Sequence, residues 1–358
     1  MKNIYLILIA PMLAIISCKP DPVEPAVYDP TPYTLDIGDF PDPVLPMDNP
    51  LTVSGVELGR MLFYEKDLSR DRSQSCADCH IQGDAFSDIR RFSVGVEGLD
   101  GKRQAMPVMN VAWHYNGMFW DGRAPRVRDQ ALKPIQDPLE MNETLPGAIA
   151  KLEANQRYRD QFIRAFGDDE ITSERMGLAM EQFMFTMVSK DSKYDKWLKG
   201  EVTLTPEEEN GRKLFFAEFD PNGVGRGAEC FHCHAGHNFT NDEFMNNGLD
   251  TDAEFTDTGR EMVTMSAFDR AKFKVPSLRN IAKTPPYMHD GRFATLEEVL
   301  DHYNTGAKNS STVEFLMQYN IQPGGLGLTA QEKSDIIAFM HTLTDDTFLT
   351  NPAYSDPN

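Results

Sequence analysis

The chain has 358 residues, 41% of them hydrophobic and 25% charged, a composition that excludes a disordered protein and allows two domains of about 150 residues. Its 55 acidic residues outnumber its 35 basic residues and give a net charge of −20, which argues against a nucleic-acid partner, since phosphate binding needs a basic face. Beyond the N-terminus there is no long apolar run, which excludes a polytopic membrane protein.

The N-terminus has the features of a targeting segment. Residues 1–17 begin with Lys2 and a mostly apolar run, too short to span a membrane and typical of a signal peptide. An apolar pair, a small residue and Cys18 follow, which resembles a bacterial lipobox and predicts a lipid on Cys18; an ordinary signal peptide with a chance Cys is the alternative. Nine prolines between residues 19 and 50 favour an extended tether, so residues 18–50 are interpreted as a lipid-anchored linker. We therefore expect an exported protein of the bacterial periplasm or cell envelope, held at the membrane by its lipid only.

Two C-x-x-C-H frames, at residues 76–80 and 230–234, carry the strongest chemical signal. In this pattern the cysteines form thioethers with haem vinyl groups, and the His binds the iron. Zinc or disulfides are the alternatives, but the frames are far apart, each carries a His at the same offset, and only Cys18 is left over. The sequence thus predicts two covalent c-type haems, haem 1 on Cys76, Cys79 and His80, and haem 2 on Cys230, Cys233 and His234.

The landmarks around the two frames recur in one order. The pairs of matching segments are 59–63 with 211–215, 107–110 with 276–280, and 119–123 with 288–292. Such a repeat predicts a mainly α protein of two tandem cytochrome c-like haem domains with long loops. The predicted boundaries are 51–200 for the N-terminal domain, 201–345 for the C-terminal domain, and 346–358 for a tail.

Capping signals and apolar spacing locate several helices. Thr205, Thr295 and Thr329 are each followed by Glu three residues later, a capping box that predicts a helix start. Methionines at helical spacing between residues 173 and 190 could be mistaken for haem ligands, but this stripe favours core packing.

The repeat also allows a comparison of the residues that could bind each haem iron on the side opposite its His. When the halves are aligned at Arg123 and Arg292, Tyr303 falls opposite Pro134. A Tyr oxygen can bind iron and Pro has no ligating side chain, so we expect haem 2 to be six-coordinate and haem 1 to be open. The alternatives are that Tyr303 is a packing residue with Met288 or another Met as the ligand, and that His114 closes haem 1.

An open haem that uses peroxide needs a group that takes a proton from the bound HOOH and returns it to the leaving oxygen. Glu140 and Gln130 flank Pro134 and are the candidates, although a lone Glu is more often a solvated surface charge. Trp120 lies in a repeat motif where His289 stands in the other half. We interpret Trp120 as an electron path between the haems, and a packed core aromatic is the alternative.

These motifs resemble the bacterial di-haem cytochrome c peroxidase family over roughly residues 51–345. The resemblance rests on the two haem frames and on segments 119–123, 130–141, 273–280 and 286–291. It implies reduction of hydrogen peroxide to water by electrons from a small donor protein, of the cytochrome c or cupredoxin type, in an enzyme that is often a homodimer. It also implies Glu140 and Gln130 as the distal-pocket pair, Trp120 as the inter-haem residue, and a calcium ion held by the Asn110 side chain and the carbonyls of Lys274 and Pro276.

Two departures from the family's common pattern matter. Residues 81–110 contain no His, so no loop His can close haem 1, and we expect it to be open at rest. Tyr303 stands where many members have Met, which looks more like the related enzyme that matures tryptophan tryptophylquinone. Oxidation of a partner protein's side chains is therefore the second functional hypothesis, and a plain di-haem electron carrier is the third.

Overall fold

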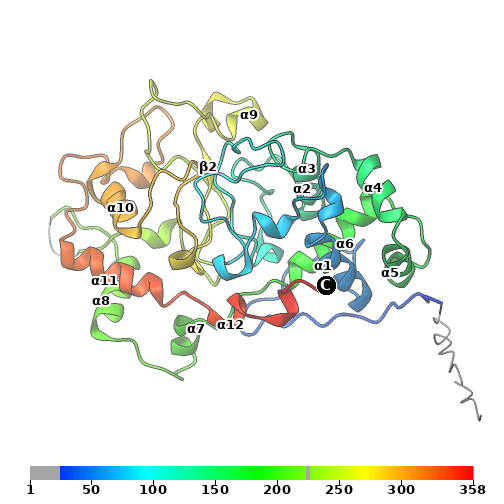
Figure 1. Cartoon of the computed structure of the whole chain (residues 1–358). Helices are drawn as coiled ribbons and strands as arrows, with labels where there is room; N and C mark the ends of the chain where they lie inside the picture. The colour runs from blue at the N-terminus through cyan, green and yellow to red at the C-terminus, as the bar shows by residue number, and fades with distance from the viewer. Residues whose placement is uncertain (1–24, 223–225, 358) are drawn as a thin grey trace, which may run out of the picture.

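Helices form most of the regular structure in this computed structural model, which describes residues 25–222 and 226–357 (Figure 1). The predicted signal peptide and Cys18 lie outside the described residues. The strands within them are β1 (Phe244–Met245) and β2 (Phe273–Lys274), an antiparallel pair in which Phe244 faces Lys274. No helix in the described ranges is both long and apolar enough to cross a membrane.

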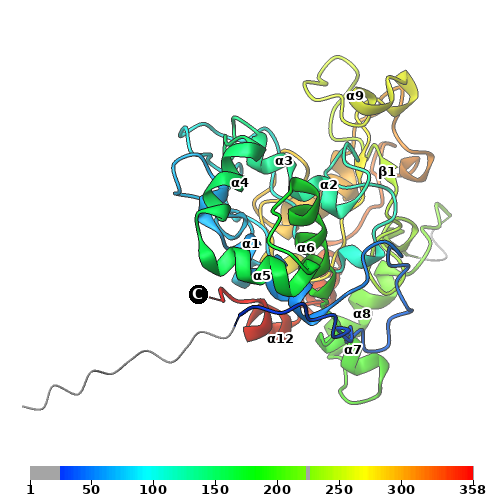
Figure 2. The same cartoon turned by 90° about the vertical axis from the view of Figure 1, so that its right-hand side faces the viewer.

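The N-terminal half is organised around α1 (Val53–Phe63) and α6 (Ser173–Thr186), which pack against each other. Helices α4 (Leu145–Glu153) and α5 (Gln156–Phe166) lie beside them (Figure 2). The Met stripe of α6 is buried in the core, as its spacing predicted. The short helices α2 (Val127–Ala131) and α3 (Lys133–Gln136) carry the segment that includes Gln130 and Pro134.

The C-terminal half is organised around α8 (Pro206–Phe215) and α11 (Ala330–His341). The capping boxes predicted at Thr205, Thr295 and Thr329 are all present, and they begin α8, α10 (Leu296–Asp301) and α11. The other helices are α7 (Lys193–Leu198), α9 (Glu261–Thr264), α12 (Asp346–Leu349) and a π-helical turn, His302–Gly306. Short 3-10 turns connect the helices, at Lys66–Leu68, Cys76–Asp78, Gln82–Asp84, Val111–Trp113, Cys230–His232, Ala267–Asp269, Ile281–Lys283, Phe315–Met317 and Pro352–Tyr354.

Each half has its own cluster of buried apolar side chains, one around α1 and α6 and one around α8 and α11. The C-terminal segment belongs to the first cluster, because Phe348, Leu349 and Tyr354 are buried in it. Residues 346–357 therefore cross back onto the N-terminal half and are packed, which the interpretation as a tail did not anticipate. Figure 1 shows the C-terminal end of the chain beside α1, and the Arg60 side chain of α1 donates to the Ser355 carbonyl at 2.6 Å.

The Pro-rich segment is extended, as predicted, but its described part lies against the body instead of standing free. Phe40 is buried, and the Trp113 indole N–H donates to the Pro41 carbonyl at 2.8 Å. Tyr33, Leu35 and Ile37 pack on the first core. Apolar side chains between the prolines give this segment a surface to bury, which a tether would lack.

The backbone repeats itself around the paired motifs. Phe119 and Met288 both adopt positive φ, 69° and 76°, and the bridge between Met118 and Ala124 recurs between Tyr287 and Phe293. The two halves thus build the same local turn around two different central side chains, Trp120 and His289.

Candidate functional site

Both C-x-x-C-H frames form a 3-10 turn that turns the His inward. In each frame the backbone N–H of the His donates to the carbonyl of the first Cys at 2.9 Å. The His80 ring donates from Nδ1 to the Phe86 carbonyl at 2.8 Å, and the His234 ring donates to the Phe239 carbonyl at 3.1 Å. These bonds fix the tautomer and leave each Nε2 lone pair available to a metal.

The chemistry of both frames fits a covalently attached haem. Cys76, Cys79, Cys230 and Cys233 are free thiols, and burial raises their pKa. Burial also lowers the pKa of His80, and lowers that of His234 to about 4, so both imidazoles are neutral at pH 7 and able to bind iron.

Glu140 lies in the turn after α3, where it is folded back toward Pro134. Its backbone N–H donates to the Asp137 carbonyl at 3.0 Å, and the next residue, Met141, donates to the Pro134 carbonyl at 3.2 Å. Burial, with a contribution from Asp137, raises the pKa of the Glu140 carboxyl to about 7, while Arg123 opposes the rise. The charge of Glu140 acts on the thiols of haem frame 1, so the carboxyl is close to that frame. Gln130, half-buried on α2, belongs to the same segment.

Tyr303 and Met288 are brought together at Asn247. The Asn247 amide nitrogen donates to the Tyr303 hydroxyl at 3.0 Å and lies 3.4 Å from Met288 Sδ. Burial raises the pKa of Tyr303 to about 12, and the Asn247 hydrogen bond opposes the rise. The thiols of Cys230 and Cys233 add to the rise, which indicates that Tyr303 lies near haem frame 2. Both candidate ligands thus face one region, and the choice between them stays a prediction.

Trp120 lies between the two halves, with 8% of its surface exposed. Its indole N–H donates to the Gln104 carbonyl at 2.8 Å, and its own carbonyl accepts from the Lys274 N–H at 2.7 Å. The Gln104 N–H donates to the His289 carbonyl at 2.8 Å, so one residue joins the equivalent positions of the two repeats. The Gln104 side chain donates to the Asp88 carbonyl at 2.9 Å. Nothing in the sequence marked Gln104, because its partners come from distant segments.

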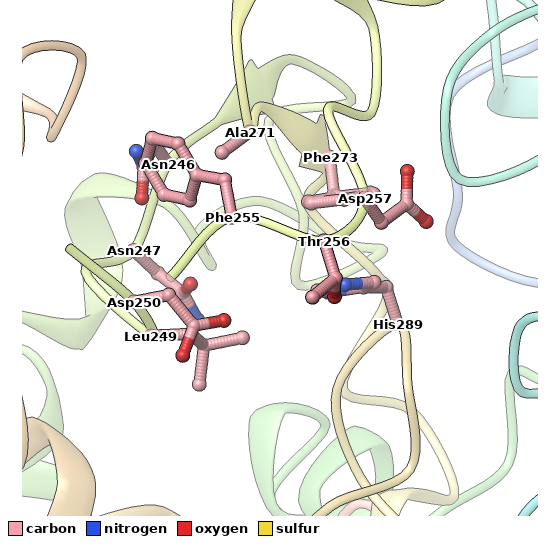
Figure 3. A pocket seen from close by; sticks show the side chains of 10 residues that line it. All are labelled: Asn246, Asn247, Leu249, Asp250, Phe255, Thr256, Asp257, Ala271, Phe273 and His289. Atoms are coloured by element: carbon pink, nitrogen blue, oxygen red, sulfur yellow. The ribbon is translucent and has the colours of Figure 1, made fainter. Parts of the chain in front are cut away.

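A small pocket borders this junction on the C-terminal side (Figure 3). His289 lines it and is stacked on Phe273, with ring centroids 3.6 Å apart and planes at 8°. Arg103 bridges the halves here, since it contacts Asp121 at 2.6 Å and Asp257 at 2.7 Å. The full lining is Asn246, Asn247, Leu249, Asp250, Phe255, Thr256, Asp257, Ala271, Phe273 and His289.

Asn110, one of the residues predicted to hold calcium, joins the two halves through hydrogen bonds. Asn110 donates to the Ser189 carbonyl at 3.1 Å and to Asn238 Oδ1 at 3.1 Å, and its own Oδ1 accepts from the Ser189 N–H at 2.8 Å. The predicted ligands are the Asn110 amide oxygen and the carbonyl oxygens of Lys274 and Pro276. Hard cations such as calcium bind oxygen ligands of this type. An ion there would share Asn110 Oδ1 with the Ser189 N–H.

A buried charge network lies next to these residues. The Lys274 ammonium group donates to Asp242 Oδ1 at 2.5 Å, and His114, the minor candidate for closing haem 1, donates to the same carboxylate at 2.7 Å. These two partners hold the pKa of Asp242 far below its usual range, although burial opposes them. His114 is thus engaged in a contact between the halves.

Comparison with known proteins gives consistent matches. The family model described as di-haem cytochrome c peroxidase matches residues 53–203. The methylamine utilization protein MauG of Methylophilus methylotrophus is 34% identical over 300 residues, 83% of this chain and 84% of that protein. Cytochrome c551 peroxidase of Nitrosomonas europaea is 34% identical over 310 residues, 85% of each chain.

Solved structures of similar proteins have a similar fold. A MauG-like protein associated with microbial copper homeostasis matches with a TM-score of 0.82 and 34% identity, over 91% of this chain and 99% of that one. The diheme peroxidase BthA of Burkholderia thailandensis matches with a TM-score of 0.70 at 21% identity, which bears on the fold alone.

Proposed function

Because this chain belongs to the di-haem cytochrome c peroxidase family, and is thus an oxidoreductase of the peroxidase type with two c-type haems, we propose that it reduces hydrogen peroxide with electrons from a small redox protein. The balanced reaction is H2O2 + 2 e⁻ + 2 H⁺ → 2 H2O. The haem groups supply the iron that binds peroxide and the store of electrons. The observation that carries the proposal is the half-buried Glu140 carboxyl, whose pKa is about 7 and which lies close to haem frame 1.

Glu140 is the proton-handling group of this proposal. A carboxyl with a pKa near the working pH can take a proton from peroxide and return it to the leaving oxygen. No described residue donates a hydrogen bond that would hold the Glu140 carboxylate in its ionised form. Gln130, one helical segment earlier, orients the peroxide with its amide.

Trp120 is the proposed electron path from haem 2 to haem 1. It contacts both halves through hydrogen bonds, since Gln104 accepts from its indole N–H and Lys274 donates to its carbonyl. Burial fixes the ring in one position between the two halves.

Replacement of Glu140 by Gln tests the proposal. The amide keeps the shape of the side chain but cannot take up a proton, so turnover of peroxide with a reduced cytochrome should fall by about 10²-fold or more. Glu153→Gln, on the exposed end of α4, is the matched control and should turn over normally. Near-normal turnover in Glu140→Gln would remove Glu140 from the mechanism.

Oxidation of a partner protein's side chains is the second candidate, and Tyr303 favours it. An anionic oxygen ligand would lower the potential of haem 2 and favour strongly oxidising states. The match to the MauG proteins points the same way. Steady peroxide turnover with a reduced cytochrome supports the peroxidase, whereas oxidation of a bound protein without such turnover supports the second candidate.

Low-temperature EPR of the ferric protein separates both candidates from a plain electron carrier. One high-spin and one low-spin haem would fit an open site beside an electron-transfer site. Two low-spin haems would show that a further ligand closes haem 1, which leaves either an enzyme that reduction activates or a plain electron carrier.

We also propose the remaining parts of the sequence-based interpretation. The protein is exported to the periplasm or cell envelope, with a lipid on Cys18 that mass spectrometry of the mature chain would detect. It binds one calcium ion through Asn110, Lys274 and Pro276, which metal analysis before and after chelation would test. A homodimer is expected from the family, and light scattering would reveal it.

A further inference from the structure

Asn247 occupies the position between the two candidate ligands of haem 2. Its amide nitrogen donates to the Tyr303 hydroxyl at 3.0 Å and approaches Met288 Sδ at 3.4 Å. Met288 and Tyr303 therefore contact the same nitrogen. They lie 15 residues apart in the sequence, and Asn247 precedes them by 41 and 56 residues. Figure 3 shows Asn247 in the wall of the pocket, beside Leu249 and Asp250.

The surrounding hydrogen bonds fix the position of Asn247. Its carbonyl accepts from His302 Nε2 at 3.0 Å, so it is tied to the residue next to Tyr303. The preceding residue, Asn246, is buried and bonds to Ser310 at 3.1 Å and to Thr312 at 3.0 Å. On the other side, Asn320 donates to the Tyr303 carbonyl at 2.6 Å. Separate hydrogen bonds thus hold Asn247, the donor, and Tyr303, the acceptor. The fold therefore fixes the contact between them.

One amide N–H has opposite effects on the two ligands. A donor beside a phenolic oxygen stabilises that oxygen when it carries negative charge, as it does when bound to iron, and the effect is larger in a half-buried site. A thioether sulfur is only a weak acceptor, and a donor directed at it occupies a lone pair that iron would need. The group that favours the Tyr303 oxygen therefore disfavours Met288.

We propose that Asn247 is a positioning residue that selects Tyr303 over Met288 as the sixth ligand of haem 2. The proposal deepens the proposed function, because it rests on haem 2 being attached at Cys230, Cys233 and His234. It does not depend on whether the electrons come from a small redox protein or from the side chains of a partner protein.

Asn247→Leu in the purified holoprotein is the test. Leucine has a similar volume and no donor, so the haem 2 spectrum should lose tyrosinate character and gain the absorption and EPR signature of a methionine-bound low-spin haem. The ratio of tyrosinate-bound to methionine-bound haem 2 should fall about tenfold, as expected for the loss of one hydrogen bond to a charged group. Asn247→Ala also lacks a side-chain donor and serves the same purpose if Asn247→Leu does not accumulate.

Matched variants identify the cause of any change. Gln331→Leu removes an amide of α11 that donates to Asp335 Oδ1 at 2.8 Å, and it should keep the wild-type spectrum. Met288→Leu alone should also keep it, whereas Asn247→Leu combined with Met288→Leu should leave haem 2 without the methionine signature.

An unchanged tyrosinate spectrum in Asn247→Leu would overturn the proposal, and so would methionine ligation in the wild-type protein. Neither result touches the proposed function, which is decided by peroxide turnover and by Glu140→Gln. If Glu140→Gln turned over peroxide normally, the proposed function would fail. The Asn247 proposal could still be tested, because its test measures the haem 2 spectrum.

Discussion

Glu140 shows how the fold changes the chemistry of a single side chain. Burial disfavours the charged form, and the neighbouring Asp137 adds repulsion, so the pKa of the carboxyl rises to about 7. To accept a proton from peroxide the carboxyl must be ionised. The fraction of molecules ready to react is therefore small at pH 5 and large at pH 8.

The pH dependence of turnover follows from this pKa. Below pH 7 the rate should rise by about tenfold per pH unit as Glu140 loses its proton, and above pH 7 it should level off. Glu140→Gln should turn over more slowly, and its rate should not show this rise between pH 5 and pH 7. Steady-state rates between pH 5 and 8.5 with a reduced cytochrome would check it, and the same limb in both proteins would assign the titration to another group.

At the scale of elements, the two helix pairs depend on two equivalent glycines. Gly59 on α1 and Gly211 on α8 come from the repeated segments 59–63 and 211–215. A Cβ on Gly59 would lie 1.9 Å from the Ala179 carbonyl oxygen, and one on Gly211 would lie 1.8 Å from that of Asp335. The recurrence of this Gly in the sequence therefore has a packing reason: it lets the backbone of one helix touch that of the next.

Alanine at either glycine should destabilise the protein. In a helix Gly→Ala usually gains about 0.5–1 kcal/mol from propensity, but a contact below 2 Å with backbone forces the helices apart, which costs about 1–3 kcal/mol. We expect the clash to dominate for Gly59→Ala and Gly211→Ala in denaturant unfolding of the holoprotein. Gly83→Ala is the control, because nothing lies within 4 Å of its Cβ position. A neutral result at Gly59 or Gly211 would mean that the helices move apart easily.

At the scale of the whole molecule, local patterns were predictable and contacts between distant segments were not. The haem frames and the capping boxes depend on fixed spacings within a few residues, so the sequence displays them directly. Gln104 and Asn247 are single polar residues in loops, and their importance arises from partners that only the fold brings together. The packed segment near Phe40 was misjudged because its prolines outweighed the apolar residues between them.

The same scale includes the charge network that joins the halves. Lys274 is 3% exposed, and its ammonium group depends on Asp242 for compensation in a site with little water. Asp242 also accepts from the Tyr115 and Asn116 backbone N–H groups at 2.6 and 2.9 Å, so one carboxylate ties the C-terminal half to the loop after η4 (Val111–Trp113).

Asp242→Asn should therefore loosen the contact between the halves. It leaves a buried ammonium without its counter-charge, which costs about 3–5 kcal/mol of unfolding free energy, whereas Asp169→Asn at an exposed position should stay within about 0.5 kcal/mol of wild type. The folded state holds the pKa of Asp242 below its ordinary value, so this stabilisation is present above pH 4 and is lost as the pH falls below it. Unfolding curves should thus show a large difference between Asp242→Asn and wild type at pH 7 and a smaller one near pH 3. An equal difference at both pH values would show that the charge of Asp242 does not stabilise the junction, and that its hydrogen bonds alone do.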